Sequence, residues 1–418
     1  MNKLLKAYLF MFIFTTFNRE FRLFGFDPRY LVVAMAAALL VGWLLNRGRE
    51  LRDDVRQCEG KFSFLDIAIL YGISTISNLS WFWNGLPLNQ EQFTNLVILN
   101  ASNALFATVL VLFRDKLNVN DILRYSLISL LIMALSMLWV YIGMELPGVF
   151  HDNEIRVLNT GESFVNLFGQ EVRIAGFAED ANYASLFSAI GFALCFTYFK
   201  PWSLIQIAAG AVFALAFALS FSKTVAIGIV MAILVLVIRW IVFKSWKSCS
   251  WILSASIALL GIFLMLRIPL FQSLSTTSTR FKLWSIAQTV LSDNPILGGG
   301  LSSVRSAINV AYNGLWYVQC HSTFWQVLAE HGPFALVVLV VIIARRYAIS
   351  RTWWQVFILT LFAALCLTSE LMYQQVFVYV LVLMPLLSLS DKPVTKGEKE
   401  LTRTQGTERI KSRVRYTS

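Results

Sequence analysis

Apolar runs that are long enough, or nearly long enough, to cross a bilayer recur along this chain. Examples are LVVAMAAALLVGWLL, VAIGIVMAILVLVIRWIVF and WILSASIALLGIFLML. Runs of this length are typical of transmembrane helices. Hydrophobic residues make up 57% of the sequence and charged residues only 14%, which excludes an ordinary soluble domain. The sequence therefore predicts an all-α, polytopic integral membrane protein.

Hydropathy assigns about twelve transmembrane helices to the chain. The first candidate resembles a signal peptide, because Lys3 and Lys6 precede an apolar run, but no small-residue cleavage site follows it, so we expect it to be retained. The first and tenth spans are short and could lie at the membrane surface or extend into their flanks. The expected ranges are 4–17, 30–46, 62–83, 93–113, 122–143, 183–199, 203–220, 224–243, 250–266, 333–345, 353–369 and 371–389.

Basic residues concentrate in alternate connections between the spans. Counted from a cytoplasmic N-terminus, NRGRELRDDVRQCEGK, RDKLNVND, FKSWKSC and RRYAISR all fall on the inner side. The opposite connections are neutral or acidic, with NREFRLFGFDPR the main exception. The positive-inside rule then predicts that both termini are cytoplasmic. We expect a membrane domain at 1–390 and a basic, disordered cytoplasmic tail at 391–418.

The net charge of +11 does not indicate a nucleic-acid partner, because much of it lies in the inner loops and the tail, near anionic lipid headgroups. We therefore expect the lipid bilayer as a partner and no nucleic acid. The five cysteines are scattered, and no Walker, HExxH or dinucleotide fingerprint is present. The outer loops lack a clustered acidic site, so we expect no metal and no cofactor.

Two outer loops are long, at about 144–182 and 267–332, and long loops in compact proteins are often functional. In the second loop, which lies between the ninth and tenth spans, FKLWSIAQTVL and STFWQVLA have helical apolar spacing. NPILGGGLSS between them has the composition of a helix end and turn. The sequence predicts a large, folded helical loop on the outer face.

Charged and polar residues flank the spans next to the first long loop. Arg173 and Asn182 are candidates for substrate binding, although Asn182 could instead bond to the start of the next helix. Glu179 and Asp180 could simply cap that helix. Lys223 interrupts two apolar runs near the outer boundary, where it either snorkels to the surface or contacts an anion in a cavity.

The second long loop carries further candidates, Arg280, Arg305, His321 and Ser322. Arg280 could be a solvated loop charge, but converging cations suit a phosphate or diphosphate. Histidine titrates near neutral pH and can carry a proton, although His321 could equally be a structural residue. His331, beside a glycine and a proline, fits a structural role better than a chemical one.

The order of these features resembles the O-antigen ligase and O-antigen polymerase superfamily of bacterial envelope glycan assembly. RIAGFAEDANYAS is similar to the family's stretch ahead of a membrane helix, with Gly176 and Asn182 matching. SFSKTVAIG is similar to the segment where the family has Ser-Arg-Gly, so Lys223 takes the place of an arginine. That change keeps the charge but loses the bidentate guanidinium.

The second loop carries the other two family segments. RFKLWSIAQTVLSDNPILGGG resembles a loop helix that opens with an essential arginine, here Arg280. HSTFWQVLAEHG resembles the family's late-loop motif of histidine, a small polar residue and a glycine, here His321, Ser322 and Gly332. The usual last residue of that motif is replaced by Ala335. The specific segments lie between residues 173 and 335.

The resemblance implies a glycosyltransferase in the bacterial inner membrane that faces the periplasm. Its donor would be an undecaprenyl-diphosphate-linked glycan, and its acceptor a lipid-linked repeat unit or the lipid A core. Arg280 and Lys223 would stabilise the leaving diphosphate, and His321 would take the proton of the acceptor hydroxyl. A repeat-unit polymerase is favoured over an O-antigen ligase, and a transporter of lipid-linked oligosaccharides is the alternative from another class. A chain-length regulator is a further candidate partner.

Overall fold

A computed structural model describes the helical part of the chain. Three of its helices are long and apolar enough to cross a membrane, Pro28–Leu45, Val119–Tyr141 and Thr323–Ile349, and six shorter apolar helices accompany them. The described residues therefore confirm the prediction of an all-α membrane protein. The described residues are 2–22, 26–47, 64–78, 90–142, 173–178, 180–242, 279–311, 320–350, 352–367, 369 and 371–386.

Every expected span except the ninth contains a described helix. The ninth, at 250–266, lies outside the described residues, so the number of spans is not tested; most of the 144–182 loop and the whole 391–418 tail also lie outside. The helices are α1 (Asn2–Phe17), α2 (Pro28–Arg47), α4 (Phe64–Ser77), α6 (Gln90–Leu112), α7 (Val119–Tyr141), α8 (Ala181–Tyr198), α9 (Leu204–Ser220), α10 (Lys223–Val242), α13 (Thr279–Asp293), α14 (Ser303–Ala311), α15 (Thr323–Ile349), α16 (Trp353–Cys366) and α17 (Gln375–Val378).

The last expected span forms the centre of the bundle. Helix α17 continues into a π-helical turn at Tyr379–Leu383, and every residue of both elements is buried. Tyr379 packs edge-on against Phe17 of α1, with ring centroids 4.9 Å apart, and bonds to the Ser126 hydroxyl of α7 at 2.8 Å. Helices from the beginning and the end of the chain therefore share one core.

Helix α15 contains both the loop helix STFWQVLA and the tenth span that the sequence predicts from 333. A break divides them at Gly332, whose φ is 81° and ψ 173°, directly before Pro333. The break lies where the tenth span was expected to begin, so the boundary between the two predicted helices is confirmed. The tenth span extends further than predicted, to Ile349 instead of 345.

The NPILGGG segment packs against the break in α15. The amides of Gly299 and Gly300 donate to the carbonyls of Ala329 and Glu330 at 2.8 and 2.9 Å, which satisfies acceptors that the break leaves exposed. A Cβ atom on Gly332 would lie 2.3 Å from the carbonyl oxygen of Ile296. Glycine at Gly332 is therefore required both by the backbone conformation and by the close approach of this turn.

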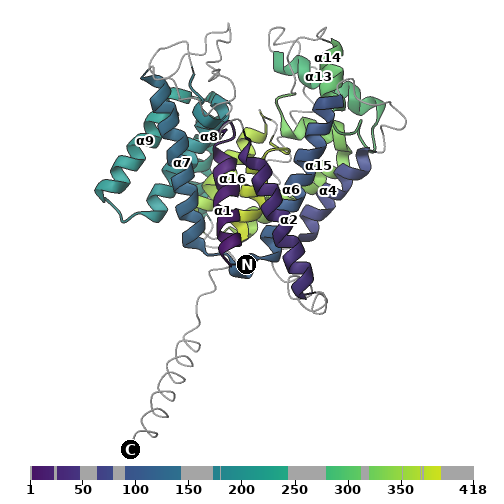
Figure 1. The fold of residues 1–418 in the computed structure, drawn as a ribbon. Helices are drawn as coiled ribbons and strands as arrows, with labels where there is room; N and C mark the ends of the chain where they lie inside the picture. The colour runs from purple at the N-terminus through teal and green to yellow at the C-terminus, as the bar shows by residue number, and fades with distance from the viewer. Residues whose placement is uncertain are drawn as a thin grey trace, which may run out of the picture.

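Helices α13 and α14 pack on the first part of α15 and form the cap. The cap has a small apolar core of its own, and it lies at the end of the bundle opposite the N-terminus (Figure 1). Helix α13 and the first part of α15 confirm the two helices predicted for the second long loop, whereas α14 was not predicted. The core residues are Leu283, Ala287, Val304, Ile308, Cys320, Trp325, Leu328 and Ala329.

Candidate functional site

Three of the predicted site residues meet beside α8, α9 and α10, together with Ser222. The guanidinium of Arg173 donates to the Ser220 backbone carbonyl at 2.7 Å and to the side-chain oxygen of Asn182 at 3.2 Å. The same Asn182 oxygen accepts from the Ser222 hydroxyl at 2.8 Å. Lys223 directly follows Ser222 and begins α10. We call these four residues, Arg173, Asn182, Ser222 and Lys223, the polar cluster.

The sequence produces the polar cluster through helix caps. Asp180 caps α8 by accepting from the Asn182 amide at 2.6 Å, which confirms the capping role for Asp180, while Glu179 lies outside the described residues. At α10, the Ser222 carbonyl and hydroxyl accept from the amides of Ala226 and Val225. Two helix N-termini, each with a short polar residue, therefore meet.

The electrostatics of the polar cluster favour an anion. Lys223 is exposed at the first turn of α10, where the helix dipole places partial positive charge. Arg173 adds a guanidinium whose position is set by two acceptors, the Ser220 carbonyl and the Asn182 side-chain oxygen, and the buried Ser222 adds a hydroxyl. A phosphate next to Lys223 would meet an ammonium group and the amide end of a helix.

The other predicted site residues lie in or beside the cap. Arg280 is in the first turn of α13, and its side chain lies outside what the structure describes; Arg305 is a partly exposed residue of α14. His321 is half-buried with a φ of 52°, an uncommon conformation for a residue with a Cβ. Ser322 caps α15 by accepting from the Trp325 amide at 3.4 Å. The structure thus places these four near the start of α15 and not within the polar cluster.

A buried polar network that was not predicted follows His321 along α15. The Tyr373 hydroxyl donates to Glu330 at 2.7 Å and lies 3.0 Å from His331 Nε2, and His331 Nδ1 lies 2.7 Å from the Ser77 hydroxyl. His331 is 1% exposed and Glu330 fully buried. Glu330 could have been recognised from the sequence, because it is an ionisable residue inside an apolar segment. The role of Tyr373 could not, because its partners Glu330 and His331 are distant in the sequence.

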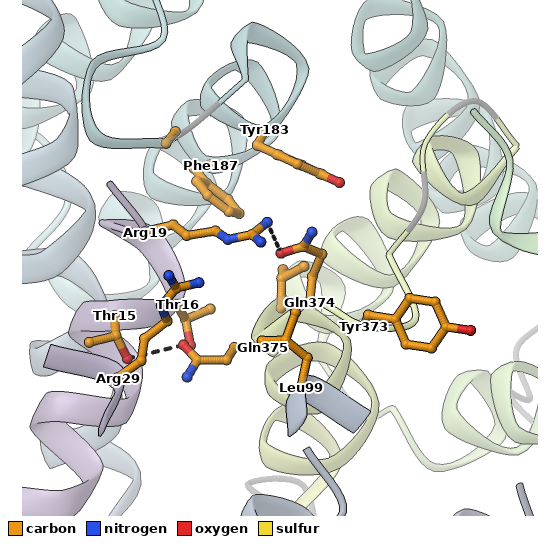
Figure 2. A pocket seen from close by; sticks show the side chains of 12 residues that line it. Thr15, Thr16, Arg19, Arg29, Leu99, Tyr183, Phe187, Tyr373, Gln374 and Gln375 are labelled. Carbon is orange, nitrogen blue, oxygen red and sulfur yellow. Dashed lines mark hydrogen bonds between the residues drawn. The ribbon is translucent and has the colours of Figure 1, made fainter. Parts of the chain in front are cut away.

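A pocket lies where α1, α2, α6, α8 and α17 meet (Figure 2). The cavity itself is small, about 20 Å³, and it opens to solvent. Arg19 and Gln374 point toward one another across it and are hydrogen-bonded, and Thr15 donates to Gln375 at 3.0 Å. We call it the arginine pocket. Its lining residues are Thr15, Thr16, Arg19, Arg29, Leu99, Ala178, Tyr183, Phe187, Tyr373, Gln374, Gln375 and Val376.

The loop between α1 and α2 supplies the charges of the arginine pocket. Arg29 donates through Nε to Asp27 at 2.8 Å, and the Arg22 guanidinium lies 3.5 Å from the same carboxylate. Burial alone would raise the pKa of the Asp27 carboxyl, but Arg29 and Arg22 together hold that pKa below its ordinary value. Asp27 is thus an anion that orients Arg29.

Comparison with known proteins gives one finding. Residues 207–340, from α9 to α15, match the family model described as O-antigen ligase. The matched segment includes Lys223, Arg280, Arg305, His321 and Ser322, and Arg173 and Asn182 lie ahead of it but bond to its residues Ser220 and Ser222. No curated protein and no solved structure matches the chain.

Proposed function

Because this chain belongs to the O-antigen ligase and O-antigen polymerase superfamily, we propose that it transfers a glycan from undecaprenyl diphosphate to a sugar hydroxyl. The site would face the periplasm, and the membrane domain at 1–390 would lie in the bacterial inner membrane with both termini cytoplasmic. Within the superfamily, the proposed activity is that of a repeat-unit polymerase. The acceptor is then a second lipid-linked repeat unit, and a chain-length regulator is a candidate partner.

The polar cluster is the observation that carries this proposal. Its Arg173–Asn182–Ser222 bonds hold the start of α10, and hence Lys223, at the end of two helices in the matched region. A lysine at the outer end of a membrane helix either snorkels to the surface or contacts an anion, and we propose the second. Binding the diphosphate of the donor is a use that matches the superfamily's chemistry.

In the proposed reaction, the oxygen of the acceptor hydroxyl attacks the anomeric carbon of the donor sugar. The bond from that carbon to the diphosphate oxygen breaks, and its electron pair leaves with undecaprenyl diphosphate. Lys223 and Arg280 stabilise the developing negative charge on the diphosphate. His321 takes the acceptor proton as a general base. Atoms and charge balance without a metal or cofactor.

The remaining predicted residues would position substrates. Arg173 and Asn182 fix the geometry around Lys223, and Asn182 can also offer its amide to a sugar hydroxyl. Arg305 is part of α14 in the cap, and Ser322 directly follows His321 at the start of α15. Because Ser322 is buried and caps α15, we propose that it holds His321 in place through that helix start.

The envelope glycan of a strain that lacks this protein tests the proposal. A polymerase deletion leaves a single capped repeat unit, because repeat units still form but are not joined. A ligase deletion leaves bare core while lipid-linked polymer accumulates. An unchanged glycan profile contradicts both activities and would favour a different role for the cationic clusters. Re-expression of the wild-type chain should restore the original profile.

A further inference from the structure

The connection NREFRLFGFDPR contradicts the charge pattern of the other outer loops, because it carries three arginines on the expected periplasmic side. The structure gives two of them a common location. Arg19, just after α1, and Arg29, in the first turn of α2, both line the arginine pocket. Arginines on the periplasmic side work against the expected orientation of the chain, so orientation does not explain them. Because two of them line one pocket, a ligand in that pocket is the better explanation.

The lining of the arginine pocket suits a phosphate-bearing carbohydrate. The Arg19 guanidinium, which is bound to the neutral Gln374, can donate paired hydrogen bonds to phosphate oxygens. Arg29, whose Nε and Nη2 donate to Asp27, adds the donors of its Nη1. The Gln374 and Gln375 amides offer both donors and acceptors to sugar hydroxyls. The rings of Tyr183 and Phe187 are stacked, with centroids 6.3 Å apart, and present apolar faces next to these amides. Among the lining residues that the structure describes, none is acidic.

The position of the pocket connects the two parts of the proposed active site. Tyr183 directly follows Asn182 of the polar cluster in the first turn of α8. Tyr373 forms another part of the wall, and its hydroxyl points away from the pocket (Figure 2) to Glu330 and His331 of α15. The wall of the pocket is therefore continuous with the polar cluster through α8, and with Glu330 and His331 of α15 through Tyr373.

We propose that the arginine pocket is a second anion site, which binds the phosphate-bearing part of the glycan acceptor through Arg19 and Arg29. The proposal rests on the proposed function, since it divides the two substrates between two cationic sites. The phosphate can come from two sources, the diphosphate of a second lipid-linked repeat unit or a phosphate of the lipid A core. Both share the chemistry that the pocket recognises.

Equilibrium binding to the purified full chain in detergent tests this assignment. The probes are the lipid-linked repeat unit and phosphorylated lipid A core, each paired with the same glycan after removal of its phosphate groups. Arg19→Gln should weaken binding of the phosphate-bearing probe about tenfold to a hundredfold, the usual worth of a hydrogen bond to a charged group. Binding of the phosphate-free glycan should not change. The probe that wild-type protein binds more tightly identifies the source.

Two further variants separate a binding effect from misfolding. Gln374→Glu has almost the same shape, keeps an acceptor for Arg19 and adds a negative charge, so it should weaken the phosphate-bearing probe by at least as much as Arg19→Gln does, and by more than it weakens the phosphate-free glycan. Arg124→Gln removes an exposed arginine from α7 and should leave binding of all probes unchanged. Unfolding temperatures of the variants show whether each is intact.

The outcomes distinguish this proposal from the proposed function. If the phosphate-bearing probe binds no better than its phosphate-free form, or if intact Arg19→Gln and Gln374→Glu proteins bind it normally, the second anion site is wrong. If wild-type protein binds a single equivalent of undecaprenyl diphosphate and both variants abolish that binding, the pocket is the donor site and the assignment is also wrong. If the probe binds as described but wild-type protein transfers no sugar, the proposed function fails and the anion site stands.

Discussion

The carboxylate of Asp66 in α4 lies 2.9 Å from the guanidinium of Arg346 in α15, and both side chains are nearly fully buried. Arg346 also donates to the backbone carbonyl of Leu381 at 2.7 Å, so one side chain joins three elements. Removing one partner of a buried ion pair leaves the other charge uncompensated, at about 3–5 kcal/mol. We expect Asp66→Ala to lower the free energy of unfolding by about that amount.

Denaturant unfolding in detergent micelles measures this change. Lys6→Ala is the matched control, because it removes the 3.0 Å pair of Lys6 with Asp121, in which the lysine side chain is 62% exposed. An exposed pair is screened by solvent, so the control should unfold like the wild type. Equal stability of Asp66→Ala and wild type would show that the buried pair does not hold α4 to α15.

The cationic role of Lys223 predicts a graded response to substitution. Lys223→Arg should retain substantial transfer activity, because the charge remains, whereas Lys223→Ala should lose most of it. Transfer by purified protein measures the difference, with Lys200→Ala, an exposed lysine at the other end of α8, as the control. Normal transfer by stable Lys223→Ala protein would mean that this lysine only snorkels to the surface.

The proposed base predicts a loss of turnover without a loss of donor affinity. His321→Ala should slow transfer by about two to four orders of magnitude, the usual contribution of a positioned general base. Binding of undecaprenyl diphosphate should persist, because Lys223 and Arg280 hold it, whereas Arg280→Ala should weaken donor binding or transfer directly. Should intact His321→Ala protein transfer sugar at the wild-type rate, Asp180 or Glu179 would be the next candidate base.

The break in α15 predicts that one glycine tolerates no side chain. Gly332→Ala would place a methyl group 2.3 Å from the Ile296 carbonyl at a positive φ, so we expect a loss of stability of about 1–3 kcal/mol or more. Gly72→Ala in α4 is the control, since nothing lies within 4 Å of its Cβ position. Thermal unfolding of both variants compares them. Similar midpoints would argue that the NPILGGG turn moves aside easily.

The charge pattern of the loops predicts the orientation of the chain. A reporter fused after Val310, in the cap, should be periplasmic, and one fused after Lys411 should be cytoplasmic. Enzymatic reporters that are active on only one side of the membrane distinguish the two locations. Reporters on the same side would mean that the number of spans between them is wrong by an odd number.

Local chemistry made much of this protein predictable from sequence. Apolar runs identified the helices, and a short polar residue ahead of one of them identified the cap at Asp180. The sequence also singled out Arg173, Asn182 and Lys223 one by one, but not the bonds that join Arg173 and Asn182 to Ser220 and Ser222. The roles of these residues stay predictions.

Contacts between distant segments were not predictable. Arg19 meets Gln374 and Asp66 meets Arg346 across more than 200 residues, and hydropathy carries no information about which helices become neighbours. The arginine pocket was therefore visible only as an anomaly, three arginines in a loop expected to be neutral. By contrast, the boundary between the cap helix and the tenth span was predictable, because a glycine and a proline between two apolar stretches are typical of a helix end, and the backbone breaks at Gly332.

Because of the break at Gly332, the first part of α15 is a helix of fixed length that sets the position of His321. The Gly299 and Gly300 amides fix its last turn, while His321 and Ser322 stand at its first turn. In an α-helix each residue adds 1.5 Å of length and about 100° of rotation. One residue inserted between Thr323 and Ala329 would therefore swing His321 to another side of the helix axis without removing any residue of the site. The number of residues from His321 to Gly332 thus sets both how far His321 lies from the NPILGGG turn and on which side of the helix axis it lies.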